Sequence, residues 1–302
     1  FLESAKIAQL VDDGSKLSVG FLIAIAAVIL CGHFMYRTRW GYAIRMIGIN
    51  QAFSKYSGMK VGTIIVVSQL LGGFLAGVGG GIEMLGRYKT FSWSSLPGYG
   101  WTGITIAILA GNNPWFVPPA AFFMAYLSKG CDLMATYAKV PAQLIDIIQG
   151  VIFLFFAAEQ FLSKYRQKLV VKSAEEEIAR KRKQRKEDTQ MLSFLKMMLT
   201  PEFFFSILRI SAPILFATLG AIVVEKAGFC NIGLEGIMMF AALTGSLVSY
   251  YAGSWFWGLL AALAMGTLMG LMMGFFAFQL KTDITLVGIA VNMMGSGGTL
   301  FL

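Results

Sequence analysis

Apolar stretches long enough to cross a membrane recur along the chain, separated by short polar connections. A bilayer core about 30 Å thick needs about 20 apolar residues of helix. The predicted spans and shorter apolar segments cover residues 17–36, 61–85, 115–127, 145–162, 207–224, 234–251, 255–279 and 284–302. The pattern therefore predicts an all-α fold, a polytopic transmembrane helical bundle of about eight to nine membrane segments.

Residues 90–103 interrupt this pattern. The stretch is aromatic and rich in glycine, contains Pro97, and is too polar for a plain span. Irregular backbone at membrane depth is tolerated only where protein or a cavity covers it. We therefore expect a re-entrant or discontinuous element here, followed by a turn at residues 112–114.

The composition supports a membrane protein. The chain is 57% hydrophobic and 14% charged, with 34 Gly and 25 Phe. Soluble domains carry about 25% charged residues, and abundant glycine suits close packing of membrane helices. These values exclude a disordered chain and disfavour a soluble one.

Few residues are suited to catalysis or metal binding. The chain lacks the phosphate-binding pattern GxxxxGK(S/T), and its one histidine, His33, lies near the end of a predicted span. Its three cysteines are widely separated, which disfavours a zinc site or a disulfide framework. We therefore expect a protein that is not an enzyme and has no metal and no cofactor.

The positive charge is concentrated in one segment. Between Lys164 and Lys186 lie ten Lys or Arg and only three acidic residues, within a chain of net charge +9. The positive-inside rule places this segment, and the basic loop at residues 37–60, in the cytoplasm. A basic run can bind nucleic acid, but the adjoining spans favour a solvated cytoplasmic tail or a membrane-surface role over a nucleic-acid partner.

The basic loop contains a first candidate site. Small residues and a terminating glycine predict a short helix over Asn50–Tyr56 that ends at Gly58 and lies flat on the cytoplasmic face. Such a helix can dock into a groove on a soluble partner, although an ordinary basic loop explains the composition as well. The candidate residues are Arg45, Gly48, Asn50, Ala52 and Gly58.

Polar residues inside apolar sequence form a second candidate set. Acidic and amide groups at membrane depth are costly and usually face a pore or a partner. In the glycine-rich stretch of residues 76–86 we expect close helix approach and local unwinding, with Glu83 either capping a broken helix or remaining a solvated charge. The candidates for a translocation path or a broken helix are Glu83, Asn231, Gly233, Glu235, Gly236 and Asn292.

Both regions resemble parts of a known family. Arg45, Gly48, Asn50, Ser57 and Gly58, followed by a glycine-rich span, resemble the cytoplasmic coupling loop of permease subunits of ABC importers for simple sugars and nucleosides, the ribose-permease-like family. Residues 212–238 resemble the N-terminal part of a permease from the same family, and look most like the branch for guanosine and other purine nucleosides.

The order of these resemblances predicts the domain organisation. Residues 1–163 resemble the C-terminal part of a first permease, with the coupling loop at 37–60. A charged cytoplasmic tail follows at 164–190, and residues 191–302 resemble the N-terminal part of a second permease. A read-through of neighbouring genes or a fragment explains this order, and we expect further residues before Phe1.

The resemblance implies a transmembrane permease component of an ABC importer in the plasma membrane. It would move nucleosides or simple sugars by alternating access, driven by a separate cytoplasmic ATPase that binds the ATP. A second permease subunit, an extracellular solute-binding lipoprotein and membrane lipid are the implied partners. The alternatives are an inactive fusion or an ion-coupled secondary transporter, which needs intramembrane acids such as Asp146, Glu159 and Asp283.

Overall fold

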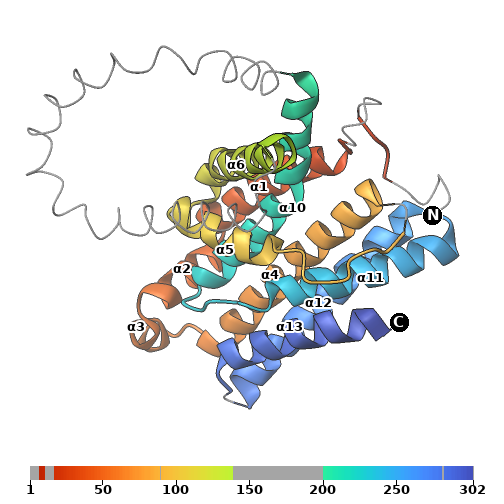
Figure 1. Cartoon of the computed structure of the whole chain (residues 1–302). Helices are drawn as coiled ribbons and strands as arrows, with labels where there is room; N and C mark the ends of the chain where they lie inside the picture. The colour runs from red at the N-terminus through yellow and green to blue at the C-terminus, as the bar shows by residue number, and fades with distance from the viewer. Residues whose placement is uncertain (1–6, 11–16, 89, 139–199, 281, 302) are drawn as a thin grey trace, which may run out of the picture. The chain divides into compact units, whose positions relative to one another are not determined.

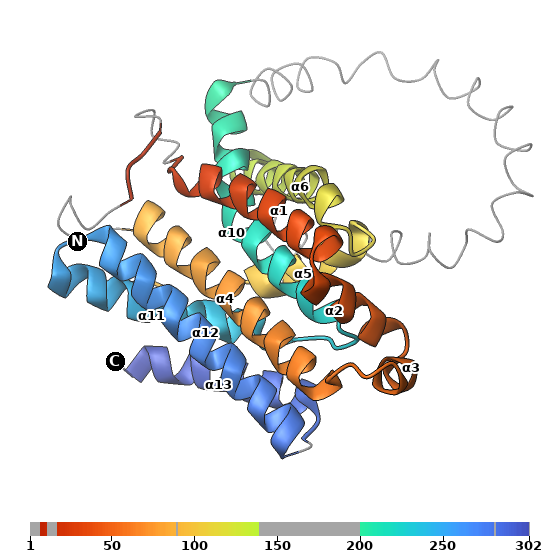
Figure 2. The ribbon, with the colours of Figure 1, turned by 180° about the vertical axis from the view of Figure 1, so that it is seen from behind.

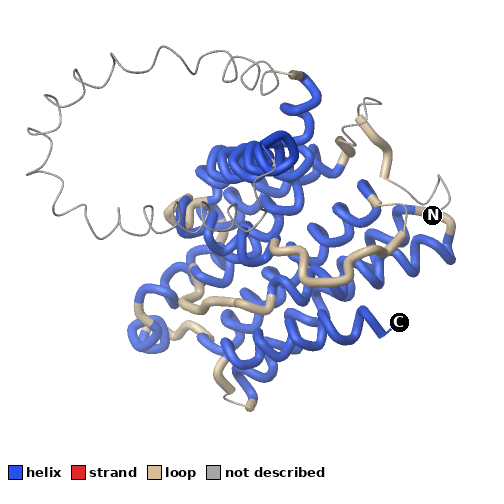
Figure 3. The backbone as a smooth tube through the Cα atoms, in the orientation of Figure 1, coloured by secondary structure: helices blue, strands red, loops and turns tan. Residues whose placement is uncertain are grey.

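The computed structural model describes residues 7–10, 17–88, 90–138, 200–280 and 282–301. Within these residues the regular elements are helices, apart from an isolated bridge between Gln9 and Ser18, and the drawn elements are helical throughout (Figure 3). The all-helical prediction is therefore confirmed. The predicted apolar segment at 145–162 and the charged tail at 164–190 lie outside the described residues.

The helices follow the predicted apolar runs closely. They are α1 (Gly20–Arg37), α2 (Arg39–Ile49), α3 (Gln51–Tyr56), α4 (Val61–Arg87), α5 (Tyr99–Leu109), η2 (Pro114–Phe116), α6 (Val117–Ala138), α10 (Pro201–Glu225), α11 (Leu234–Ala252), α12 (Trp255–Gln279) and α13 (Ile284–Phe301). Among the described residues, α1, α4, α10 and α12 are long and apolar enough to cross a membrane. The fold is thus that of a polytopic membrane protein, while the total of eight to nine segments stays a prediction.

The chain forms two compact units. The first comprises Phe1–Met124 and Leu208–Leu302, and the second comprises Ala125–Ile207. In the second unit, the Tyr126 and Phe203 rings meet edge to face, with their centroids 5.9 Å apart. The first unit joins sequence from both sides of the charged tail, so the two predicted permease portions contribute to one packed body.

Helix α4 is the centre of the first unit. It lies against α11 and α12 (Figures 1 and 2). The contact with α12 is made by glycines: a Cβ on Gly73 would lie 2.8 Å from the Cα of Gly270, and one on Gly77 would lie 2.9 Å from the Cα of Gly266. Only residues without a side chain allow two backbones to approach this closely.

The structure corrects one prediction about α4. The helix runs unbroken from Val61 to Arg87, so the expected local unwinding of residues 76–86 is wrong. The glycines serve the predicted close approach instead, because neighbouring helices pack directly on their backbone. An unwound segment in the membrane would have to find new partners for its N–H and C=O groups, which a continuous helix satisfies internally.

Candidate functional site

The predicted short helix of the basic loop is present as α3. Asn50 precedes its first turn, and its Oδ1 accepts a hydrogen bond from the backbone N–H of Phe53 at 3.0 Å, as a helix-capping residue does. Gly58 follows the helix with φ of +80°, a left-handed conformation that glycine adopts without strain. The local sequence thus specifies both ends of α3.

Helix α3 presents apolar side chains outward. Phe53 and Tyr56 are 56% and 95% exposed, and Ile49, just before the helix, is 78% exposed. The candidate residue Ala52 is exposed beside them. Aromatic and aliphatic side chains exposed together in a basic loop are typical of a docking surface for another protein.

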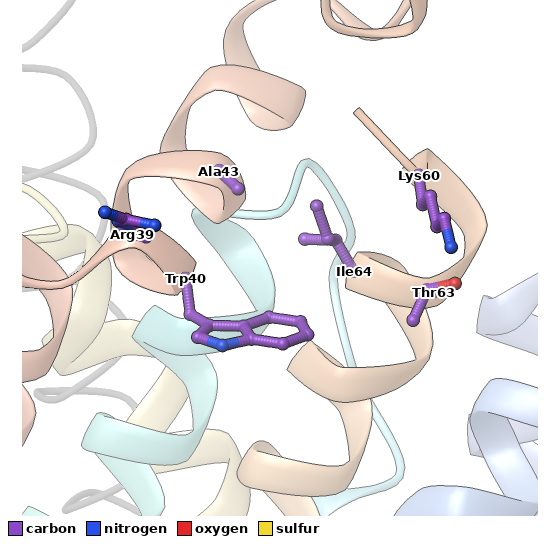
Figure 4. Close-up of a pocket in the computed structure, with 6 residues that line it drawn as sticks. All are labelled: Arg39, Trp40, Ala43, Lys60, Thr63 and Ile64. Atoms are coloured by element: carbon purple, nitrogen blue, oxygen red, sulfur yellow. The ribbon is translucent and has the colours of Figure 1, made fainter. Parts of the chain in front are cut away.

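A shallow groove lies between α2 and the start of α4. It has a volume of about 230 Å³, and Trp40 reaches across it toward Ile64 (Figure 4). Arg39 and Lys60 also line it. The groove therefore presents a mostly apolar surface flanked by two basic residues.

The basic loop contacts the turn after α10, which lies within residues 212–238, the second region that resembles the permease family. A Cβ on Gly48 would overlap the carbonyl oxygen of Lys226 and lie 3.2 Å from the backbone nitrogen of Gly228. Gly228 itself has φ of +89° in the turn that follows α10. The two motifs, far apart in the sequence, therefore meet through their glycines.

Two side-chain amides hold the start of α11. Asn231 accepts a hydrogen bond from the N–H of Gly233 at 2.9 Å, and Asn292 of α13 accepts one from the N–H of Gly236 at 2.7 Å. The first N–H groups of a helix have no partner within the helix. Asn292 also donates to the carbonyl of Ile232 at 3.0 Å, which fastens α13 to the turn before α11. The predicted residues Asn231, Gly233, Gly236 and Asn292 therefore form one buried cluster.

Asn231 also reaches α4. Its Nδ2 donates to Oε1 of Gln69 at 2.9 Å, and both side chains are buried. Gln69 was not predicted from the sequence, although an amide in the middle of an apolar span carries the same cost that singled out Asn231. This bond links α4 directly to the turn before α11.

Glu235 binds the N-terminus of the short helix α5. Its carboxylate is fully buried and accepts hydrogen bonds from the backbone N–H groups of Gly98, Gly100 and Trp101, the latter two at 2.8 and 3.1 Å. A helix N-terminus carries a partial positive charge and unpaired N–H donors, which a carboxylate satisfies. The expected discontinuous element at residues 90–103 is thus a loop followed by a helix that Glu235 anchors.

Glu83 of α4 also contacts the first residue of α5. It is 4% exposed, accepts a hydrogen bond from the hydroxyl of Tyr99 at 3.1 Å, and forms a salt bridge with Arg87 at 2.9 Å. The interpretation as a solvated charge is therefore wrong, because protein covers the carboxylate. Nor does it cap a broken helix, because α4 continues past it. Arg87 and Tyr99 are partners that the sequence did not reveal.

The aromatic residues near this site differ in environment. Trp93 is buried in a cluster with Met84 and Met239, whereas Trp101 is about half exposed. The described contacts therefore assign Trp93 to the support of the loop before α5.

We expect the Asn231–Gln69 hydrogen bond to show coupling in a double-mutant cycle. Each single change, Asn231→Leu or Gln69→Leu, leaves the other amide buried without its partner, whereas the double change removes both. The cycle should give a coupling energy of about 0.6 kcal/mol, the average for hydrogen bonds between membrane helices, and no more than about 1.7 kcal/mol. Thermal unfolding of the four proteins in one detergent measures it, and additive effects would contradict the pairing.

One family model matches most of the chain. It is described as "Branched-chain amino acid transport system / permease component", and it matches residues 3–157 and 203–302. The two matched segments lie on either side of the charged tail. They include both motif regions described above.

Curated relatives are similar to parts of the chain. The glucose ABC transporter permease protein TsgB13 of Haloferax volcanii is 34% identical over 166 residues, 53% of this chain and 44% of the relative. The guanosine ABC transporter permease protein NupP of Bacillus subtilis is 32% identical over 165 residues, which are 54% of this chain and 47% of the relative. The guanosine ABC transporter permease protein NupQ of the same organism is 37% identical over 99 residues, which are 30% of this chain and 31% of the relative. The chain thus spans less than half the length of these relatives, and no solved structure matches it.

Proposed function

We propose that the chain forms part of the membrane permease of an ABC importer. The premise is that it belongs to the family of transport-system permease components whose model matches it. It is a multi-pass protein of the plasma membrane, and ATP is bound and hydrolysed by a separate cytoplasmic subunit. The solute crosses by alternating access. The observation that carries this proposal is the family match on both sides of the charged tail.

The geometry of the basic loop supports a role in coupling. Helix α3 presents Phe53 and Tyr56 on the face that the positive-inside rule assigns to the cytoplasm, where an ATPase docks. Movement of this loop reaches the turn after α10 through the contact between Gly48 and Lys226. That turn leads to Glu235, which anchors α5. Arg45, Gly48, Asn50, Ala52 and Gly58 thereby act on the membrane helices through packed contacts.

We infer the domain organisation from the two resembling regions, which lie in the two segments that the family model matches. Residues 1–163 would be a C-terminal permease portion, 164–190 a charged tail and 191–302 an N-terminal portion. The alignments with NupP and NupQ extend over 165 and 99 residues, close to the lengths of the matched segments 3–157 and 203–302. We infer that the two segments originate in two different permeases. Detection of one or two polypeptides at the locus distinguishes a true fusion from a read-through without activity.

The transported solute is a nucleoside, of the purine type, or a simple sugar. The relatives named for guanosine and glucose support this class. A second permease subunit, an ATPase and an extracellular binding protein complete the transporter. Uptake of labelled guanosine and labelled glucose by cells that carry the whole operon tests the proposal. Unchanged uptake of both solutes after deletion of the permease genes would overturn it.

The ion-coupled alternative gains no support from the described acids. Glu83 and Glu235 are engaged by donors of this chain, and Asp283 accepts from the N–H of Thr285 at the start of α13. Asp146 and Glu159 lie outside the described residues. Uptake that continued without ATP and stopped when the ion gradient collapsed would favour this alternative.

We expect changes at the ends of α3 to uncouple ATP hydrolysis from uptake. Asn50→Leu removes the cap of α3, at a cost of about 1 kcal/mol, and Gly58→Leu forces a bulky residue into a left-handed conformation, at a cost of about 1–2 kcal/mol. Both sites are on the surface, so membrane insertion should be unchanged. The ratio of solute transported to ATP hydrolysed in the assembled transporter measures coupling.

Matched variants control this prediction. Asn50→Ser keeps a capping oxygen, and Gly58→Asn keeps a residue that tolerates left-handed φ, so both should retain most of the coupling. Normal coupled transport by Asn50→Leu and by Gly58→Leu would count against the coupling assignment of this loop.

A further inference from the structure

The shallow groove between α2 and α4 lies at the cytoplasmic end of two spans. Its lining comes from α2, which directly follows the span α1, and from residues 60–64 at the start of the span α4. The positive-inside rule places the basic loop, residues 37–60, in the cytoplasm. The groove is therefore at the level where the head groups of the inner leaflet meet the ends of the spans.

Both charges of the groove are positive. Arg39 and Lys60 line it, both are exposed, and neither forms a salt bridge within the described part of the chain. Figure 4 shows them on opposite sides of Trp40 and Ile64. The basic loop contains no Asp or Glu that could neutralise them. The groove therefore favours an anionic ligand, and its lining has no carboxylate for the ammonium group of a zwitterionic one.

The remaining lining of the groove is mostly apolar. Trp40 is 48% exposed and lies across the groove from Ile64, which is 7% exposed. Ala43 completes this apolar wall from α2. Tryptophan is enriched where a bilayer meets water, because its ring is apolar and its N–H is polar. A ligand that fills the groove therefore carries an apolar chain as well as a negative charge, which a free inorganic anion does not.

The order of these groups along α4 matches the order of groups in a phospholipid. Lys60 precedes the first turn of the helix, and Ile64 follows one turn later, about 6 Å further into the span. Positive charge therefore lies at the level of the head groups, and apolar surface lies on the membrane side of it. An acidic protein surface would also match the charges, but this position of the apolar wall favours a lipid.

We propose that the groove binds an anionic phospholipid of the inner leaflet, such as phosphatidylglycerol. The phosphate lies between Arg39 and Lys60, and the start of an acyl chain packs against Trp40 and Ile64. Guanidinium and ammonium groups form charge-assisted hydrogen bonds with phosphate oxygens, and clustered basic residues beside a span attract the anionic lipids of the cytoplasmic leaflet. Because the lipid contacts both α2 and α4, it stabilises the packing of the basic loop on the start of α4.

Lipid binding to the purified chain tests this proposal without a transport assay. The chain in detergent is titrated with phosphatidylglycerol and, separately, with phosphatidylcholine that carries the same acyl chains. Native mass spectrometry counts the bound lipid at each concentration. We expect phosphatidylglycerol to bind more tightly by about fivefold or more, because each basic residue near an anionic lipid surface contributes about this factor.

Three variants and one control locate the site. Arg39→Gln and Lys60→Gln each remove one charge and should weaken phosphatidylglycerol binding by about fivefold. Trp40→Ala keeps both charges but removes apolar surface, and it should weaken binding as well. Lys55→Gln removes an exposed charge of the same loop that does not line the groove, and it should leave binding unchanged. Melting temperatures in the same detergent show whether each variant is folded.

A preference for phosphatidylglycerol that all three variants reduce and Lys55→Gln keeps supports the proposal. Equal binding of the two lipids would overturn it. So would equal losses in Lys55→Gln and Lys60→Gln, which would show attraction by the charge of the loop as a whole. Unchanged lipid binding in the variants, together with weaker copurification of the ATPase subunit, would assign the groove to a protein partner and overturn it too. Lipid binding is measured without transport, so this proposal can fail while the proposed function stands.

Discussion

Glu235→Ala is expected to lower the free energy of unfolding by about 3 kcal/mol, because leaving even one buried donor without its acceptor costs about 1–3 kcal/mol. The carboxylate satisfies three backbone N–H groups at the start of α5. After its removal these donors remain buried without an acceptor, and the dipole of α5 loses its counter-charge. The loop before α5 should then become accessible to protease.

Thermal unfolding in detergent and protease cleavage within residues 90–98 measure this effect. Glu202→Ala is the matched control, because Glu202 is exposed in the first turn of α10. Glu235→Gln keeps one acceptor oxygen and should lie between the wild type and Glu235→Ala. Equal melting temperatures for Glu235→Ala and Glu202→Ala would contradict the assignment of Glu235 as the anchor of α5.

Gly73→Leu should separate α4 from α12. A Cβ at Gly73 would overlap the carbonyl oxygen of Gly266 and lie 2.9 Å from the nitrogen of Gly270. A backbone cannot move aside as a side chain can, so the helices must part along the contact. We expect a loss of about 3 kcal/mol or more and poor accumulation in the membrane.

A graded series tests the steric cause. Gly73→Ala should destabilise by less, about 1–3 kcal/mol. Gly297→Leu on α13 is the control, because a Cβ there meets nothing within 4 Å. The variants are compared by yield and by melting temperature in one detergent. A Gly73→Leu protein as stable as Gly297→Leu would show that the α4–α12 contact is looser than described.

The long apolar runs predicted their helices well. The predicted span at 255–279 coincides with α12 (Trp255–Gln279), and the run at 234–251 gives α11 (Leu234–Ala252). In a membrane each span satisfies its own backbone, so composition and length alone are sufficient. The short helix α3 was predictable for a local reason as well, since Asn50 caps it and Gly58 ends it.

The glycine-rich part of α4 was less predictable. Glycine weakens a helix intrinsically, so the sequence favoured unwinding at residues 76–86. The structure keeps the helix because α12 packs directly on its backbone at Gly77. Whether such a stretch unwinds depends on the partner helix, which the local sequence does not contain.

The sequence by itself determined the membrane class, the positions of the spans, the ends of α3 and the polar residues that needed partners, because each depends on local composition or on the cost of burying charge. Only the tertiary structure decided what those partners are. Glu235 meets the N-terminus of α5, and Asn231 meets Gln69, across separations of more than 130 residues. A buried polar group requires a partner, but the packing of distant helices determines which group it finds.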